Sequence, residues 1–226
     1  MSGAPWITRG ALRITRGALW AAWRGQRAQA AAVAALIPLY ASCAVAERLD
    51  PGLSGLTVQL AGFLPGAVCL LWGAPLVARE FETGTYRLAW TQSLSRGRWL
   101  AAAVAVAATG ALAATGALGV LLAWALPAYQ GDPMAWAYYE SHGLVPYARV
   151  VFALMLGVAV GAVSGHTRIA MPLSMLLTGV VQFGGRMLRE RADSSYWVAQ
   201  RAETVLYLVL ALALAVLALL AVRRRA

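Results

Sequence analysis

The sequence predicts an all-α polytopic membrane protein with six transmembrane helices. Of its 226 residues, 61% are hydrophobic, and the mean hydropathy is +0.65. Six apolar runs are each long enough to cross a hydrocarbon core of about 30 Å as a helix. They cover residues 28–46, 56–78, 100–126, 148–165, 167–184 and 204–222. The chain therefore divides into an N-terminal segment, residues 1–27, and one transmembrane domain, residues 28–226.

The N-terminal segment predicts an amphipathic helix that lies on the membrane surface. Residues 7–19 contain a tandem heptad, Ile-Thr-Arg-Gly-Ala-Leu-Arg followed by Ile-Thr-Arg-Gly-Ala-Leu. On a helix, the Arg side chains of the segment fall within an arc of about 80°, with Trp20 and Trp23 on or beside it. This stripe is typical of a helix at an anionic leaflet. The alternative is a frayed basic tail that only fixes topology, because Gly10 and Gly17 weaken the helix.

The distribution of Arg predicts that both termini are cytoplasmic. Six crossings put both termini on one side, and that side carries thirteen Arg and two Glu, whereas the other carries six Arg and seven acids. The thirteen are Arg9, Arg13, Arg16, Arg24, Arg27, Arg79, Arg87, Arg96, Arg98, Arg168, Arg223, Arg224 and Arg225. Residues 79–99, between the second and third runs, are then cytoplasmic. We expect a multi-pass protein of a bacterial cytoplasmic membrane.

The composition excludes several functions. All nineteen basic residues are Arg, so the chain has no Lys for a Walker ATP-binding loop or a Schiff base. The net charge of +10 concerns membrane orientation before ligands, and we expect no nucleic-acid partner. Ser164 and His166 form the one enzyme-like string, but residues two apart on a helix point to different faces. We therefore predict no catalytic residue, no metal site and no cofactor in this chain.

The predicted spans carry no charged residue away from their ends, which bears on how transport would be powered. Ion-coupled carriers usually need ionisable groups or clustered oxygen ligands within the membrane. An ion-coupled carrier is therefore the weaker alternative, and an external energy source is favoured.

Residues 79–99 form a charged, glycine-containing segment between two apolar runs. After Arg79, the segment carries Glu80 and Glu82, and Gly84 permits a sharp turn. Thr85 can cap a short helix over residues 86–92. The alternative is an ordinary loop whose Arg residues only obey the topology rule.

This segment resembles that of the membrane subunits of ABC-2-type exporters. The family's Glu followed by Gly-Thr matches Glu80, Gly84 and Thr85, and Gln92-Ser93-Leu94-Ser95-Arg96 is similar to its Ser-Pro-x-Ser-Arg string. Ser93 stands where Pro is frequent in the family, and the Lys often found where the third span begins is missing. The six-span layout and the N-terminal helix are similar too.

The resemblance implies a permease that forms a homodimer in the lipid bilayer and binds two copies of an ABC ATPase subunit. ATP and Mg²⁺ would then be bound by the ATPase. Residues 79–99 would act as the coupling helix, with charged groups at the rim of the contact and an apolar anchor at its centre. The residues expected to couple are Glu80, Glu82, Gly84, Thr85, Tyr86, Arg87, Leu88, Trp90, Arg96 and Arg98.

In this family the second and fifth spans tend to line the substrate route. The resemblance therefore nominates Gln59, Phe63, Thr178, Gln182 and Phe183. A lining that is mostly apolar suits a hydrophobic or amphipathic substrate such as a drug, lipid or peptide. The expected function is multidrug-type efflux across the membrane. The rival is a membrane anchor or sensor that recruits an ATPase without transporting.

Glycines at every fourth position predict narrow helix faces for close packing. Gly157, Gly161 and Gly165 follow this spacing in the fourth span, and Gly62 and Gly66 in the second. Two alternatives remain open, a seam between two permease copies and packing within one chain.

Overall fold

The computed structural model describes residues 17–50, 53, 55–84, 95–125, 134–191 and 195–224. All of the regular structure in these residues is helical. The predicted heptad before residue 17 and the predicted short helix at 86–92 lie outside the described residues. Residues 17–25 are helical, and the helices that follow are α2 (Arg27–Ala34), α3 (Leu36–Leu49), α4 (Leu56–Ala61), α5 (Leu64–Val68), η2 (Cys69–Gly73), α6 (Ala74–Thr83), α8 (Arg96–Ala125), α9 (Trp136–Ser141), α10 (Val145–Ser164), α11 (Thr167–Arg191) and α12 (Tyr196–Arg224).

Five helical segments are long and apolar enough to cross a membrane. They are Arg27–Leu49, Leu56–Thr83, Arg96–Ala125, Val145–Ser164 and Tyr196–Arg224, and each contains most of one predicted run. The chain is thus a multi-pass membrane protein by helix length and hydropathy. α11 covers the remaining run with 25 residues, but it does not reach the same apolar mean because Arg168, Pro172, Ser174 and Gln182 interrupt it. The sixth crossing therefore stays a prediction.

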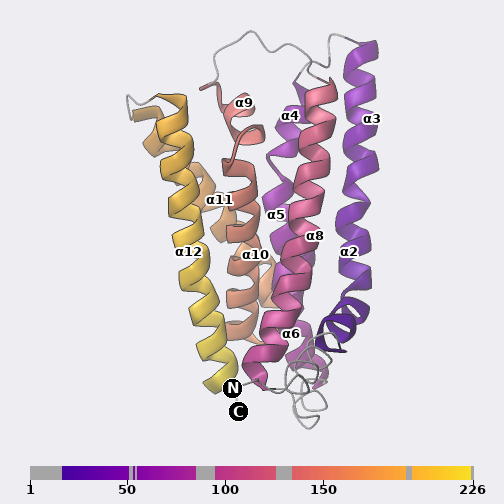
Figure 1. The fold of residues 1–226 in the computed structure, drawn as a ribbon, viewed down its shortest axis with the longest axis vertical. Helices are drawn as coiled ribbons and strands as arrows, with labels where there is room; N and C mark the ends of the chain where they lie inside the picture. The colour runs from indigo at the N-terminus through magenta and orange to yellow at the C-terminus, as the bar shows by residue number, and fades with distance from the viewer. Residues whose placement is uncertain are drawn as a thin grey trace, which may run out of the picture.

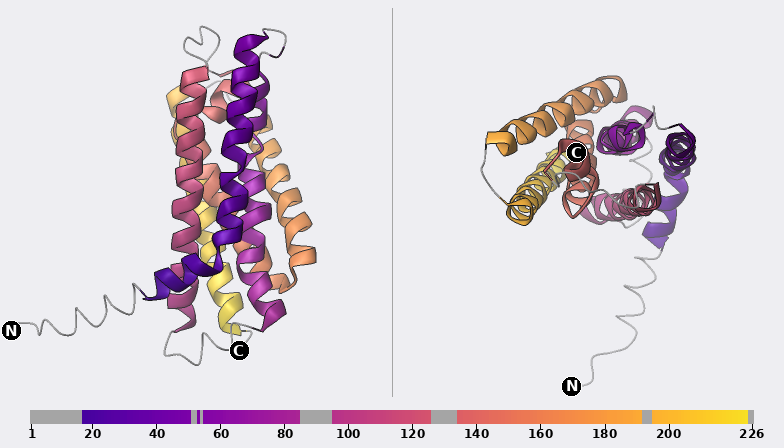
Figure 2. Two further views of the ribbon diagram at one scale, coloured as in Figure 1. Left: turned by 90° about the vertical axis from the view of Figure 1, so that its right-hand side faces the viewer. Right: turned by 90° about the horizontal axis from the view of Figure 1, so that it is seen from above.

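The long segments alternate in direction and form one bundle around α10 (Figure 1). α10 contacts α12, α6, α11, η2, α5 and α8, and it is the most deeply buried of the five candidate spans. α3 packs on α8 at one side, while α11 and α12 both pack on α10 at the other (Figure 2). Because α10 is surrounded by protein, its neighbours determine its residue sizes more than lipid does.

The helix of residues 17–25, the C-terminus of α6 and the C-terminus of α12 lie at one end of the bundle (Figures 1 and 2). We call this the basic end and the opposite one the far end. The helix of residues 17–25 turns away from the bundle axis, and Trp20, Trp23 and Arg24 on it are exposed (Figure 2). This orientation is the one that the predicted surface helix requires, and its place on a membrane stays a prediction.

Glycines bring α10 against the second span at backbone distance. A Cβ built on Gly157 would lie 2.6 Å from Ala74 N, and one on Gly161 would lie 2.5 Å from Ala74 O. From the other side, a Cβ on Gly73 would lie 2.7 Å from Leu154 O. Gly157 and Gly161 therefore pack within one chain, which is the second of the two alternatives that the spacing left open.

The remaining predicted packing glycines differ from this pair. Gly165 ends α10 in the left-handed conformation, with φ of 69°. A Cβ on Gly62 would lie 3.3 Å from Gln59 O, whereas one on Gly66 would meet nothing within 4 Å. Gly66 thus leaves space beside the second span and makes no close helix contact there.

We expect Gly161→Ala to destabilise the bundle by about 1–3 kcal/mol, because the added methyl group collides with the α6 backbone. Thermal unfolding in detergent micelles measures the change. Gly179→Ala is the matched control, since a Cβ there meets nothing within 4 Å and removal of a helical glycine favours folding by about 0.5–1 kcal/mol. Equal unfolding temperatures for the two variants would contradict the packing.

Candidate functional site

The predicted coupling segment leaves the bundle at the C-terminus of α6. Gly84 ends this helix in the left-handed conformation, with φ of 69°. The next described residue is Ser95, and α8 begins at Arg96. Five predicted coupling residues, Thr85, Tyr86, Arg87, Leu88 and Trp90, lie outside the described residues, and the others flank them on both sides.

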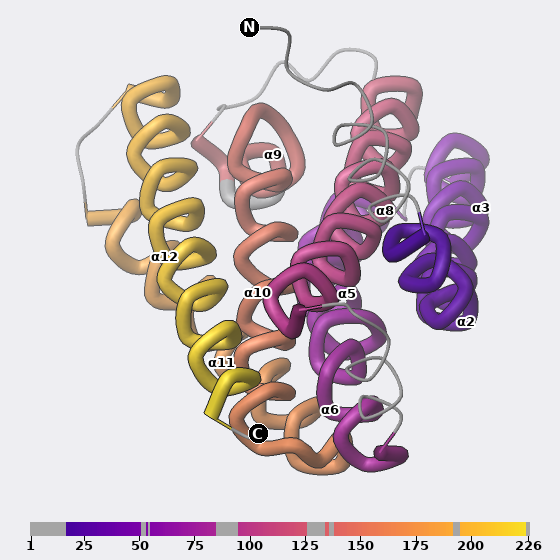
Figure 3. Tube along the Cα trace, turned by 60° about the horizontal axis from the view of Figure 1, so that its bottom comes forward, coloured from indigo at the N-terminus to yellow at the C-terminus, as the bar shows by residue number. Residues whose placement is uncertain are grey.

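Glu82 caps the N-terminus of α11. The Thr167 backbone N–H donates to Glu82 Oε1 at 2.7 Å, and the Thr167 hydroxyl donates to Glu82 Oε2 at 2.8 Å. The first turn of a helix has N–H groups without partners inside the helix, and a carboxylate is favourable there. α6 and the start of α11 meet at the basic end (Figure 3). The end of the second span is thereby tied to the start of α11.

The other described coupling residues point in different directions. Glu80 lines a cavity beside the helix of residues 17–25, together with Arg79. Arg96 Nη1 donates to Arg223 O at 3.2 Å, which links the start of α8 to the end of α12. Arg98 is exposed. Glu80, Arg96 and Arg98 thus all lie at the basic end.

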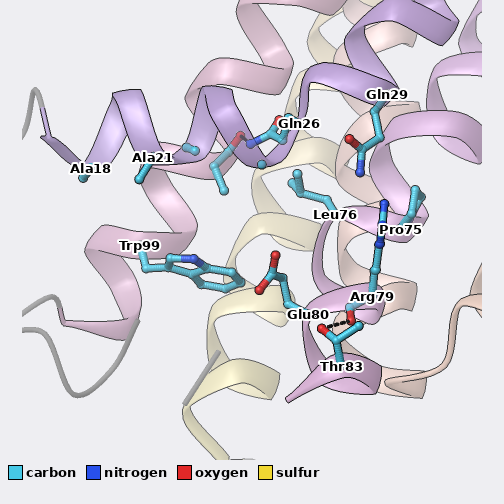
Figure 4. A pocket seen from close by; sticks show the side chains of 13 residues that line it. Ala18, Ala21, Gln26, Gln29, Pro75, Leu76, Arg79, Glu80, Thr83 and Trp99 are labelled. Carbon is cyan, nitrogen blue, oxygen red and sulfur yellow. Dashed lines mark hydrogen bonds between the residues drawn. The ribbon is translucent and has the colours of Figure 1, made fainter. Parts of the chain in front are cut away.

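The cavity beside Glu80 has a volume of about 380 Å³ and opens between the helix of residues 17–25, α6 and the start of α8 (Figure 4). Its upper wall carries Gln26 and Gln29, and Arg79 and Glu80 reach toward it from α6 (Figure 4). Gln26 fixes this wall, because it donates to Ala103 O at 3.1 Å and accepts from Trp72 Nε1 at 2.8 Å. No local sequence pattern predicts this cavity, because it depends on contacts between the first three spans.

All five residues predicted to line a route surround a second cavity, of about 490 Å³, between α4–α5 and α11. They are Gln59, Phe63, Thr178, Gln182 and Phe183, and Gly62, Gly66, Glu140, Met175, Gly179 and Arg186 complete the lining. Phe63 and Phe183 are 66% and 62% exposed, so the cavity is an open groove on the side of the bundle. The structure brings the five residues together, and their part in transport stays a prediction.

The polar groups of this groove are few. The Thr178 hydroxyl donates to Ser174 O at 2.8 Å and is therefore used within its own helix. Gln182 Nε2 is buried without a hydrogen-bond acceptor. An unpaired buried donor costs free energy unless a ligand or a second chain supplies its acceptor. The groove thus offers apolar side chains together with the amides of Gln59 and Gln182.

A buried cluster of four charged side chains joins the helices at the far end. Arg149 lies 3.2 Å from Glu140 and 3.4 Å from Glu203, and Arg189 lies 3.4 Å from Glu140 and 2.8 Å from Glu203. The exposed fractions run from 2% for Arg149 to 12% for Glu140. The two Arg and two Glu balance in charge, and each comes from a different helix, α10, α11, α9 or α12. We call these four residues the ion cluster.

Two titratable groups next to the ion cluster are uncharged near pH 7. Burial raises the pKa of the Tyr139 phenol and lowers the pKa of the His142 imidazole. The Arg189 guanidinium lies over the Tyr139 ring, 4.1 Å from its centroid. Neither group therefore adds a charge to the cluster. Each carboxylate faces two guanidinium groups, so the four side chains compensate one another's charge.

Gln200 holds the turn between α9 and α10 against α12. Its Oε1 accepts from the N–H groups of Leu144 and Val145, both at 3.1 Å. Its Nε2 donates to Tyr139 O at 3.2 Å and to His142 O at 3.1 Å. No sequence pattern predicts a role for Gln200 or for the ion cluster. Their residues lie between the predicted apolar runs or at the ends of these runs, where charged and amide side chains are ordinary.

A comparison with protein families gives one match. The model of the family described as "ABC-2 membrane transporter related" matches residues 14–189, most of the chain. The match includes the helix of residues 17–25, the coupling segment and the groove. No curated protein and no solved structure matches the chain.

We expect Glu203→Gln to destabilise the protein by about 3–5 kcal/mol, because it leaves two buried guanidinium groups short of a carboxylate. Unfolding in detergent micelles, followed by temperature or denaturant, measures the loss. Glu190→Gln is the matched control, since the Arg186–Glu190 pair is half-exposed and such pairs contribute about 0–1 kcal/mol. A small and equal loss in both variants would show that the ion cluster does not hold the far end together.

Proposed function

The chain belongs to the ABC-2 membrane transporter related family, and we propose that it is the permease subunit of an ATP-driven exporter. Membrane subunits of this family work in general with an ATPase, and this chain has no Lys with which to form a Walker ATP-binding loop of its own. Two ATPase copies would bind at the basic end. This end would face the cytoplasm, which is the orientation that the Arg distribution favours.

The observation that carries this proposal is the contact between Glu82 and Thr167. Glu82 lies at the start of the segment predicted to dock on the ATPase, and Thr167 begins a helix that lines the groove. A displacement of the docking segment would therefore act directly on α11. This is a short physical route from ATP hydrolysis to the substrate-binding wall, and a passive membrane anchor has no need of it.

The groove supports a hydrophobic or amphipathic substrate. Phe63, Met175 and Phe183 give it an apolar wall, and Gln59 and Gln182 provide amides for orientation. Beside it on α11, Leu176 and Val180 are 64% and 58% exposed and line a more open hollow that shares Phe183 with the groove. A second copy of the chain facing this side would close the groove into a central path. The homodimer is thus part of the same proposal.

We expect Glu80→Arg and Arg96→Glu to reduce association with the ATPase at least tenfold, because each reverses a charge next to the docking segment. Co-purification of the chain with its candidate ATPase measures association. Glu190→Arg, at the far end, is the charge-reversal control and should leave association unchanged. Undiminished binding by both basic-end variants would overturn the docking site.

Coupling after docking would depend on the contact between Glu82 and Thr167. We expect Glu82→Gln and Thr167→Val each to lower substrate-stimulated ATPase activity several-fold, because each weakens the link between the docking segment and α11. The double variant should lose no more than the worse single variant, because both act on one contact. ATPase binding should be retained in all three.

Reconstituted liposomes with and without candidate substrates measure this stimulation. Additive losses in the double variant would show that Glu82 and Thr167 act separately. An ATPase rate that no transported compound changes would favour the anchor or sensor over the exporter.

A further inference from the structure

The cavity at the basic end, which Arg79, Glu80 and Gln29 line, has the features of a lipid headgroup site. It lies between the helix of residues 17–25, α6 and the start of α8, and its volume of about 380 Å³ falls within the range of small-ligand sites. It lies beside the helix of residues 17–25, whose exposed Trp20 and Trp23 are typical of headgroup depth. We propose that it binds the headgroup of a phosphatidylethanolamine-type lipid.

Small residues leave the space that a headgroup needs. Ala18, Ala21, Ala22 and Gly25 line the cavity from the helix of residues 17–25. Larger side chains at these positions would fill it. Hydrogen bonds hold this wall in place, because Gln26, which follows the helix, is 4% exposed and is bonded to both Trp72 and Ala103. The cavity is thus built into the junction of the first three spans.

One basic and one acidic side chain line the cavity. Arg79 and Glu80 approach the cavity from adjacent positions of α6 (Figure 4). Arg79 is exposed and presents guanidinium donors suited to a phosphate. Glu80 presents a carboxylate, which suits a cation. One positive and one negative side chain match a zwitterionic headgroup better than an anionic one, which Glu80 would repel.

The Gln29 side chain has a hydrogen-bond acceptor without a donor. Gln29 lines the cavity and is 9% exposed, and its Oε1 has no hydrogen-bond partner. A buried acceptor left unpaired is costly, so a ligand that brings a donor gains from it. A primary ammonium has three N–H donors, whereas a trimethylammonium group has none. Gln29 therefore favours ethanolamine over choline, although Trp99 in the same cavity could attract either cation through its ring.

The lipid assignment does not depend on the ATPase and can be tested on the full chain alone. Native mass spectrometry of the delipidated protein in detergent would measure retention of phosphatidylethanolamine, phosphatidylcholine and phosphatidylglycerol with identical acyl chains. We expect one phosphatidylethanolamine per chain, retained about tenfold in preference to the other two, the preference that one hydrogen bond to a charged group supports.

Variants separate the three recognising groups. Gln29→Leu and Glu80→Gln should each abolish most of the preference for ethanolamine over choline. Arg79→Gln should weaken retention of both lipids alike, because it removes the phosphate partner. Ala21→Trp should block the site without changing any recognising group, since Ala21 is an exposed lining residue that can accept a larger side chain.

Arg24→Gln is the matched control, because Arg24 is exposed on the same helix and does not line the cavity. Size-exclusion elution and the unfolding temperature of each variant check its fold. Equal retention of all three lipids, or a preference that Ala21→Trp and Gln29→Leu leave unchanged, would overturn the proposal. Preferential retention of phosphatidylglycerol would also overturn it and would indicate attraction by the surface Arg residues alone.

Discussion

The attachment of α11 at its two ends is the constraint on which the rest of the structure depends. At the far end Arg189 joins it to Glu140 and Glu203, and at the basic end Glu82 caps its first residue, Thr167. Along its middle, only a narrow strip of small residues spaced four apart, Ala170, Ser174 and Thr178, is buried. Leu177 and Val181 beside this strip are partly buried against the core, and the opposite face, with Leu176, Val180 and Phe183, is exposed. Polar contacts at its two ends therefore add to the packing of a helix that buries one face only.

This arrangement follows from the physics of helices in lipid. Burying apolar side chains between spans gives little advantage when the surrounding lipid is equally apolar, so close backbone contact and polar contacts decide which helices associate. α10 uses the first of these, through Gly157 and Gly161 against Gly73 and Ala74. α11 uses the second. The two neighbouring helices are therefore held by different means, and the polar one is the easier to alter from outside the bundle.

Much of the fold could be predicted from the sequence, because hydropathy over about twenty residues is a strong local signal. The prediction was weakest where helices continue beyond their apolar runs. α12 begins at Tyr196, well before the run at 204–222, because Gln200 and Glu203 are paired with other helices. α11 shows the opposite problem. Its Arg168 and Gln182 lower its hydropathy below that of the five candidate spans, and yet it forms a continuous helix of 25 residues.

The candidate site was predictable where one helix face is enough to define it, and not where partners come from distant parts of the chain. The groove residues lie on two helices, and the family resemblance placed these helices together. Glu82 and Thr167 are 85 positions apart, and the ion cluster joins residues from four helices, so no local pattern could pair them.

The pairing also bears on the source of energy for transport. The ion cluster holds its four charged side chains in mutual contact, so each of them has an opposite charge beside it. A carrier driven by protons or sodium needs an ionisable group that exchanges its ion during the cycle. Glu82 and Thr167 form a polar contact between the end of the second span and the helix that lines the groove. Force applied at the basic end, as the proposed exporter requires, would act on α11 through this contact.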